Sequence, residues 1–170
     1  PVCREIPLLG DMRADKKAFA AAAERSCGAV IAQPNAPTSL AESAEDILGI
    51  VRAFGGKTVI VDEAYADFSR VPSLARHIAE YPGLLVVKTF SKSRSLAGAR
   101  CGYAIGGAEL INALRTVKDC FNSYPVNAVT AAEAEAARAD DGDFRDCVAK
   151  LKATRSRMTD GLRALRFGVP

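Results

Sequence analysis

Lys92 is the first residue of this chain whose position suggests chemistry. It lies just beyond the apolar run Leu84–Val87, which has the composition of a buried strand, and a reactive amine would be expected at such a place. Hydroxyl groups at Thr89 and Ser91 and the guanidinium of Arg100 flank it, and such groups can hold a phosphate. On this segment alone, an ordinary solvated basic loop is the simpler interpretation.

A second segment has the same character. Asp62 directly follows the β-branched run Thr58–Val61, and Tyr65 comes a short turn later. Ligands of open α/β sheets bind outside the carboxyl ends of the strands, so an acid there is aimed at a ligand. We therefore expect Asp62 and Lys92 to lie at the same edge of a sheet, close to a common cavity. A helix cap is the alternative for Asp62, and on this segment alone it is the better one.

The elements that must position these residues alternate along the chain. We expect strands near 29–33, 58–62, 84–88 and 101–105. We expect helices over 15–26, 41–54, 108–117, 126–140 and 143–165, the second capped by Thr38 or Ser39 and ended by Gly55-Gly56. Strands separated by helices are typical of an α/β fold, here a three-layer α/β/α sandwich with a mostly parallel sheet.

The two segments together are far more specific than either alone. The order Asp62-Glu63-Ala64-Tyr65, Thr89-x-Ser91-Lys92 and Leu96-Ala97-Gly98-x-Arg100-x-Gly102-Tyr103 resembles the core of the fold-type-I pyridoxal-phosphate aminotransferases. The turn Pro34–Thr38 resembles the Asn-Pro-Thr-Gly region of that family, and Phe121–Asn127 resembles the stretch that follows the lysine in its histidinol-phosphate branch. The resemblance covers nearly the whole chain and implies the large domain of such an enzyme.

The resemblance also implies a role for each site residue. Lys92 would be the catalytic lysine, which forms a Schiff base with the aldehyde of pyridoxal 5'-phosphate and later moves a proton. The Asp62 carboxylate would keep the pyridine nitrogen protonated, and Tyr65 would donate to the phenolic oxygen. The cofactor phosphate would be held by three side chains: Ser91, Arg100 and Thr89. No metal is expected.

The turn contains one departure from the family pattern. Ala36 stands where the family has an asparagine that contacts the phenolic oxygen, and Ser39 stands where it has glycine. One hydrogen bond is thereby lost, and a partner left unsatisfied would cost about 1–3 kcal/mol. We expect Tyr65 to hold that oxygen alone.

The implied activity is transamination between histidinol phosphate and 2-oxoglutarate in histidine biosynthesis, by a homodimer that takes a small-molecule amino donor and a 2-oxo acid. A related threonine-phosphate decarboxylase, another class I and II aminotransferase and a non-catalytic aminotransferase-like domain are the alternatives. We expect residues 1–150 to be part of the cofactor-binding large domain. Residues 143–170 would form a helix that leads to a small domain beyond Pro170, and the chain would be a fragment.

Composition limits the remaining possibilities. A net charge of +3 on 170 residues gives no reason to expect nucleic acid, and no apolar run has the length of a bilayer span. The five cysteines form no C-x-x-C pair and no signal peptide precedes them, which favours a reducing compartment such as the cytoplasm. His77 is the only histidine, which makes a catalytic triad or a metal site built on histidine a poor interpretation of this sequence.

Overall fold

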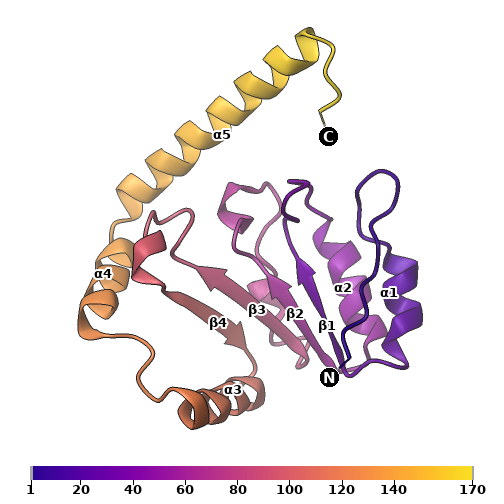
Figure 1. The fold of residues 1–170 in the computed structure, drawn as a ribbon, viewed down its shortest axis with the longest axis vertical. Helices are drawn as coiled ribbons and strands as arrows, with labels where there is room; N and C mark the ends of the chain where they lie inside the picture. Colours follow the sequence, from indigo (N-terminus) through magenta and orange to yellow (C-terminus); the bar gives the residue numbers. More distant parts are fainter. Residues whose placement is uncertain (1, 170) are drawn as a thin grey trace.

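The computed structural model describes residues 2–169, and its centre is a four-stranded sheet (Figure 1). The strands follow one another in chain order: β1 (Gly28–Ala32), β2 (Thr58–Asp62), β3 (Leu84–Thr89) and β4 (Gly102–Gly106). The pairs β1–β2 and β2–β3 are parallel, whereas β4 runs antiparallel to β3. Every predicted strand is present to within one residue at each end, and the α/β class with a mostly parallel sheet is confirmed.

Helices connect and flank the strands. The α-helices are α1 (Lys16–Ala23), α2 (Ala44–Ala53), α3 (Ala108–Phe121), α4 (Ala128–Ala139) and α5 (Asp141–Ala164), and the short 3₁₀ helices are η1 (Ala66–Phe68), η2 (Leu74–His77) and η3 (Ala97–Ala99). Side chains cap four of the α-helices at their N-termini: Asp15, Ser43, Asn127 and Asp140. Beyond the end of α2, Gly55 and Gly56 take positive φ angles of 59° and 88°, which favour glycine. No helix within residues 2–169 is both long and apolar enough to cross a membrane.

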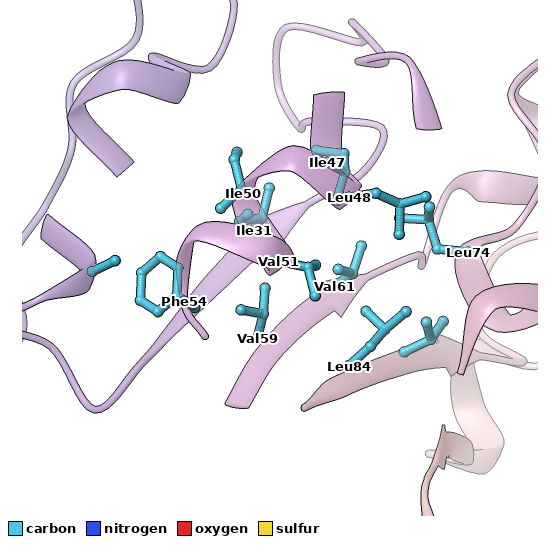
Figure 2. Packing of buried hydrophobic residues seen from close by; sticks show 12 residues of the cluster. Ile31, Ile47, Leu48, Ile50, Val51, Phe54, Val59, Val61, Leu74 and Leu84 are labelled. Carbon is cyan, nitrogen blue, oxygen red and sulfur yellow. The ribbon is translucent and has the colours of Figure 1, made fainter. Parts of the chain in front are cut away.

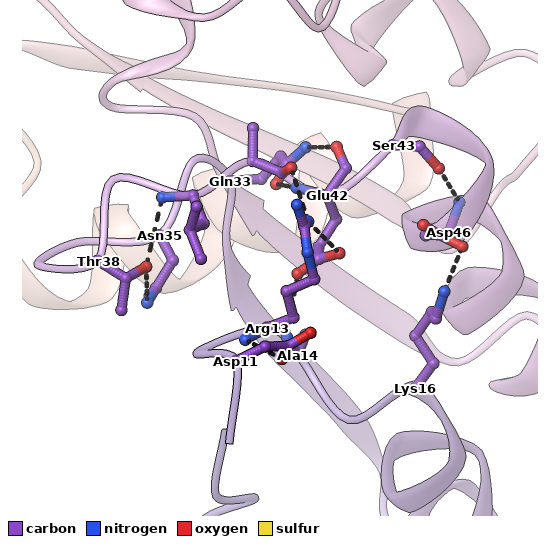
Figure 3. A network of polar contacts seen from close by, with 12 residues as sticks. Asp11, Arg13, Ala14, Lys16, Gln33, Asn35, Thr38, Glu42, Ser43 and Asp46 are labelled. Carbon is purple, nitrogen blue, oxygen red and sulfur yellow. Dashed lines mark hydrogen bonds and ion pairs between the residues drawn. The ribbon is translucent and has the colours of Figure 1, made fainter. Parts of the chain in front are cut away.

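The predicted cap of the second helix is wrong. The helix begins at Ala44, and Ser43 caps it by accepting a hydrogen bond from the backbone N–H of Asp46 at 3.1 Å. The start lies beyond Thr38 and Ser39 because a reciprocal pair of hydrogen bonds holds the preceding segment outside the helix. The Gln33 amide donates to the Glu42 carbonyl at 2.6 Å and accepts from the Glu42 N–H at 3.0 Å (Figure 3).

This buried Gln33–Glu42 pair also closes the base of the turn formed by residues 34–39. The Glu42 carboxylate accepts from Arg13 at 3.3 Å and from the backbone N–H of Ala14 at 3.0 Å, so the segment before α1 is attached to the same point (Figure 3). Inside the turn, the Asn35 amide donates to the Thr38 hydroxyl at 2.9 Å. The turn is therefore an ordered structure at the carboxyl end of β1.

The hydrophobic core lies on one face of the sheet (Figure 2). Strand residues on this face meet side chains of α2 and the residue that follows it: Ile31, Val59, Val61, Leu84 and Val86 against Ile47, Leu48, Ile50, Val51 and Phe54. Alternate strand residues point to the opposite face, where Val30 is 68% exposed. The described residues thus show the sheet with one helical layer closely packed on it.

The arrangement brings three connections to one edge of the sheet. Parallel strands end at a common edge, and β1, β2 and β3 are followed there by the turn 34–39, by the turn that leads to η1, and by the loop 90–101. Helix α5 approaches the same edge after the chain has passed through α3 and α4 (Figure 1). Its Arg155 donates to the carbonyl of Phe68 in η1 at 2.9 Å.

Candidate functional site

Lys92 and Tyr65 meet at this edge. The loop that follows β3 carries Lys92, and the turn that follows β2 carries Tyr65. The Lys92 ammonium lies 5.1 Å from the centroid of the Tyr65 ring, within the range of a cation–π contact. The Lys92 side chain is otherwise exposed, so its amine is accessible to a ligand.

Asp62 ends β2 with its carboxylate exposed at the same edge. Its Oδ1 accepts a hydrogen bond from the backbone N–H of Ala64 at 2.9 Å, which turns the chain toward Tyr65. No helix starts at Asp62, so the helix-cap interpretation is wrong. Its second oxygen, Oδ2, makes no hydrogen bond to any residue between 2 and 169 and is free to accept one from a ligand.

The three predicted phosphate contacts lie at the base of the loop 90–101. Thr89 Oγ1 lies 2.9 Å from Ser91 Oγ and accepts from the Ser91 N–H at 3.1 Å. Arg100 stands on the returning arm in the left-handed region, with φ of 53°, and its guanidinium donates to the carbonyl of Ala97 at 2.9 Å. The structure therefore brings the hydroxyls of Thr89 and Ser91 together. The Arg100 guanidinium instead contacts Ala97, which precedes it by three residues in the same loop.

A charged network beneath the loop was not predicted from the sequence. Lys88, near the end of β3, lies 3.4 Å from Asp67 and 3.6 Å from Glu63, whose side chain is 1% exposed. Asp67 also accepts from the hydroxyl of Ser93, the residue after the loop lysine, at 2.5 Å. The available signals were a lysine directly after the apolar run Leu84–Val87 and a second acid directly after Asp62. Neither feature of the sequence shows that Lys88 and Glu63 form an ion pair with each other.

The network keeps Lys88 charged. Burial alone would lower the pKa of Lys88, but the carboxylates of Asp67 and Glu63 outweigh it and raise the pKa above the ordinary lysine value. Glu63 is further satisfied by two donors at the start of η2: the Ser73 hydroxyl at 2.6 Å and the Leu74 N–H at 2.7 Å. Lys88 is thus held in ion pairs with two carboxylates, whereas the exposed Lys92 makes no ion pair within residues 2–169.

The raised pKa of Lys88 makes stability depend on alkaline pH. A raised folded-state pKa stabilises the fold fully below the unfolded-state value of about 10.5, and this contribution is lost as the pH rises through the folded-state pKa. We therefore expect Lys88→Met to lower the thermal midpoint at pH 8, and the difference from wild type to shrink above about pH 10.5. Exposed Lys150→Met is the matched control. A difference that stayed constant from neutral to strongly alkaline pH would contradict the assignment.

A cavity of about 1000 Å³ opens beside Tyr65. The turn 34–39, including Ala36, forms one wall, residues 68–71 form another, and α5 contributes a third. Its charged lining is mainly cationic: Arg70, Arg155 and Arg163, with Asp160. Among the predicted site residues only Tyr65 lines it. Asp62 and Lys92 lie at the expected edge of the sheet, but neither forms part of the cavity wall.

Comparisons with known proteins show which family this chain is similar to. The sequence model of the family "Aminotransferase class I and II" matches residues 2–170. The chain is 42% identical over 166 residues to histidinol-phosphate aminotransferase of Acetobacter pasteurianus, covering 98% of this chain and 46% of that protein. It is 46% identical over 142 residues to the enzyme of that name from a Marinomonas species, covering 84% of this chain and 40% of that protein.

A solved structure shows the same fold. Histidinol-phosphate aminotransferase of Sinorhizobium meliloti, in complex with pyridoxal-5'-phosphate, superimposes with a TM-score of 0.81 at 25% identity, over 91% of this chain and 42% of that one. The chain thus spans less than half the length of these relatives. The assignment of residues 1–150 to a large domain and of 143–170 to a connection with a small domain stays a prediction. Because the family match extends over the described residues from end to end, this chain belongs to the class I and II aminotransferases.

Proposed function

We propose that the protein containing this chain is a pyridoxal-phosphate-dependent aminotransferase that transfers an amino group between histidinol phosphate and 2-oxoglutarate. The observation that carries the proposal is the position of the Lys92 amine, 5.1 Å from the Tyr65 ring at the sheet edge where Asp62 ends β2. Relatives at 42–46% identity bear the name histidinol-phosphate aminotransferase, which supports this substrate.

The residues at this edge fit the proposed cofactor. Pyridoxal phosphate supplies an aldehyde that combines with amines and a ring that accepts electrons from the substrate carbon. The free Oδ2 of Asp62 would hold the protonated pyridine nitrogen, and the Tyr65 hydroxyl would bind the phenolic oxygen. The phosphate of the cofactor would be held at the base of the loop 90–101 by three groups: the hydroxyls of Ser91 and Thr89 and the guanidinium of Arg100.

Lys92 would supply the proton chemistry. Its amine would attach the cofactor in the resting protein, and once displaced by substrate it would hold and return the proton of the substrate α-carbon. Its exposed position beside Tyr65 suits both tasks, because the amine is held by one aromatic contact and is not bound in an ion pair within residues 2–169. Lys88, which is held between two carboxylates, does not suit them.

The cavity beside Tyr65 suits anionic substrates. Histidinol phosphate carries a phosphate and 2-oxoglutarate carries two carboxylates, and three arginines against one aspartate line the cavity. Opposite charge in a concave site attracts and orients such molecules. This complementarity favours a phosphorylated amine as donor and a dicarboxylic 2-oxo acid as acceptor.

We also propose a homodimer in the cytoplasm. Large apolar side chains between the end of α3 and the start of α4 are strongly exposed, with Phe121 at 94%, Tyr124 at 91% and Val129 at 68%, and exposed apolar surface favours association. All five cysteines are free, which suits a reducing compartment. Sedimentation of the complete gene product at several concentrations tests the dimer.

The proposed reaction is tested on the complete gene product supplied with pyridoxal phosphate. We expect visible cofactor absorbance, and glutamate formation that requires both histidinol phosphate and 2-oxoglutarate. Release of carbon dioxide from threonine phosphate without glutamate formation would instead identify the related decarboxylase. Absence of cofactor absorbance would identify a non-catalytic aminotransferase-like domain.

A further inference from the structure

Arg94 attaches the loop 90–101 to the corner between α4 and α5. Its guanidinium donates to the carbonyls of Ala137 at 2.6 Å and Asp140 at 3.2 Å, and to the Asp141 carboxylate at 3.4 Å. The guanidinium carbon lies 3.6 Å from the centroid of the Phe144 ring. Although it belongs to a surface loop, the Arg94 side chain is only 17% exposed. The three hydrogen bonds join residues that are 43 to 47 positions apart in sequence.

Arginine suits this set of contacts better than lysine does. The guanidinium offers five donors in a planar fork and stacks flat on an aromatic face, whereas a lysine ammonium has three donors and no planar face. The carbonyls that it binds lie at the C-terminal end of α4, where the helix dipole favours a positive charge. Arg94 therefore forms a specific attachment and is not an ordinary solvated cation.

The residue between Lys92 and Arg94 is fixed on the other side. The Ser93 hydroxyl donates to Asp67, which pairs with Lys88, and Ser93 is 6% exposed. Two consecutive loop residues are thus attached to different parts of the structure. Ser93 is bound to the charged network beneath the loop, and Arg94 is bound to the corner between α4 and α5. Lys92 stands directly before this double attachment, and its side chain is exposed.

Helix α5 links this attachment to the cavity. Its first residue, Asp141, binds Arg94, and its later residues Arg155 and Arg163 line the cavity beside Tyr65. A shift of α5 would therefore be transmitted through Arg94 to the loop that carries the lysine.

We propose that Arg94 is a positioning residue, which sets the place of the Lys92 amine relative to Tyr65 and ties it to the position of α5. The inference rests on the proposed function of Lys92. Without the attachment the loop would lose one of its two fixed points, and the amine would no longer be held where the proton must be transferred. A misplacement of about 1 Å can lower turnover by about 100-fold.

The test uses the complete gene product and four variants. Arg94→Met keeps a long side chain against Phe144 but removes the charge and the donors, whereas Arg94→Lys keeps the charge. Asp141→Asn weakens the same attachment from the α5 side. Arg138→Met, on the exposed surface of α4, is the matched control.

We expect Arg94→Met to lower kcat by about 10- to 100-fold, with KM for the amino donor changed by less than about threefold. Arg94→Lys should recover part of the loss, Asp141→Asn should show a smaller loss, and Arg138→Met should match wild type. The pH midpoint of the cofactor absorbance should move in Arg94→Met and stay unchanged in Arg138→Met, because only the former displaces the amine.

A second readout does not depend on activity. In the cofactor-free protein, amide hydrogen exchange over residues 91–96 should be faster in Arg94→Met than in wild type by about tenfold or more, since the loop opens more often. Wild-type values of kcat, midpoint and exchange in Arg94→Met would overturn the proposal. If Arg94→Met fails to fold, Asp141→Asn decides by the same measurements. Failure of the proposed function would appear separately, as absence of amino transfer in the wild-type protein.

Discussion

Replacement of Lys92 by alanine is expected to abolish amino transfer by the complete gene product, with a fall in kcat of at least about 1000-fold. The reason is that one amine is asked to attach the cofactor and to transfer the substrate proton, and the proton transfer alone contributes about 10²- to 10⁴-fold. The visible absorbance of bound cofactor should disappear, and borohydride should no longer fix a pyridoxyl group to the peptide that contains residue 92.

The neighbouring lysine cannot replace Lys92 in this experiment. Lys88 lies between Glu63 and Asp67, and the two carboxylates raise its pKa, so its amine stays protonated and engaged in ion pairs. Exposed Lys150→Ala serves as control and should retain full activity. Turnover of Lys92→Ala at the wild-type rate, or borohydride labelling of another lysine, would remove Lys92 from the reaction.

Asp62→Asn is expected to retain bound cofactor and to lower kcat by roughly 100-fold. The change replaces a carboxylate with an amide of nearly the same shape, so the Oδ1 that accepts from the Ala64 N–H is preserved and the turn toward Tyr65 should remain intact. An amide cannot stabilise the positive charge on the pyridine nitrogen. Loss of a charge-assisted hydrogen bond of about 1.5–3 kcal/mol corresponds to roughly one to two powers of ten in rate.

The measurement separates this electronic role from a structural one. Thermal unfolding and cofactor absorbance of Asp62→Asn should stay close to wild type while kcat falls. Asp146→Asn, an exposed change of the same chemistry on α5, should leave both unchanged. An Asp62→Asn protein with wild-type kcat would show that the carboxylate does not act on the cofactor ring.

The strands and the edge that carries the site could be predicted from the sequence because they depend on local patterns. The β-branched run Thr58–Val61 and the apolar run Leu84–Val87 produce buried strands where they meet a helical layer. Parallel strands place their carboxyl ends together, so Asp62 and the loop of Lys92 had to share one edge. The Tyr65 ring follows from the same rule, because it lies only three residues beyond the strand end.

Other features depend on residues that are distant in sequence, and no local pattern contains them. The start of α2 was placed wrongly because Ser39, Thr38 and Ser43 are all acceptable caps, and the choice is made by the hydrogen bonds between Gln33 and Glu42. The charge network around Lys88 joins residues up to 25 positions apart through their burial and not through their spacing.

The sequence by itself thus determined which side chains stand at the carboxyl edge of the sheet: strand periodicity and chain direction are properties of short segments. Only the tertiary structure decided how the loop of Lys92 is held. Arg94 appears in the sequence as one more cation in a basic loop, and it becomes an attachment only because α4 and α5 return to that loop and present carbonyls, a carboxylate and an aromatic ring to it. The physical reason is that a contact across more than 40 residues depends on the packing of whole elements, which local propensity does not encode.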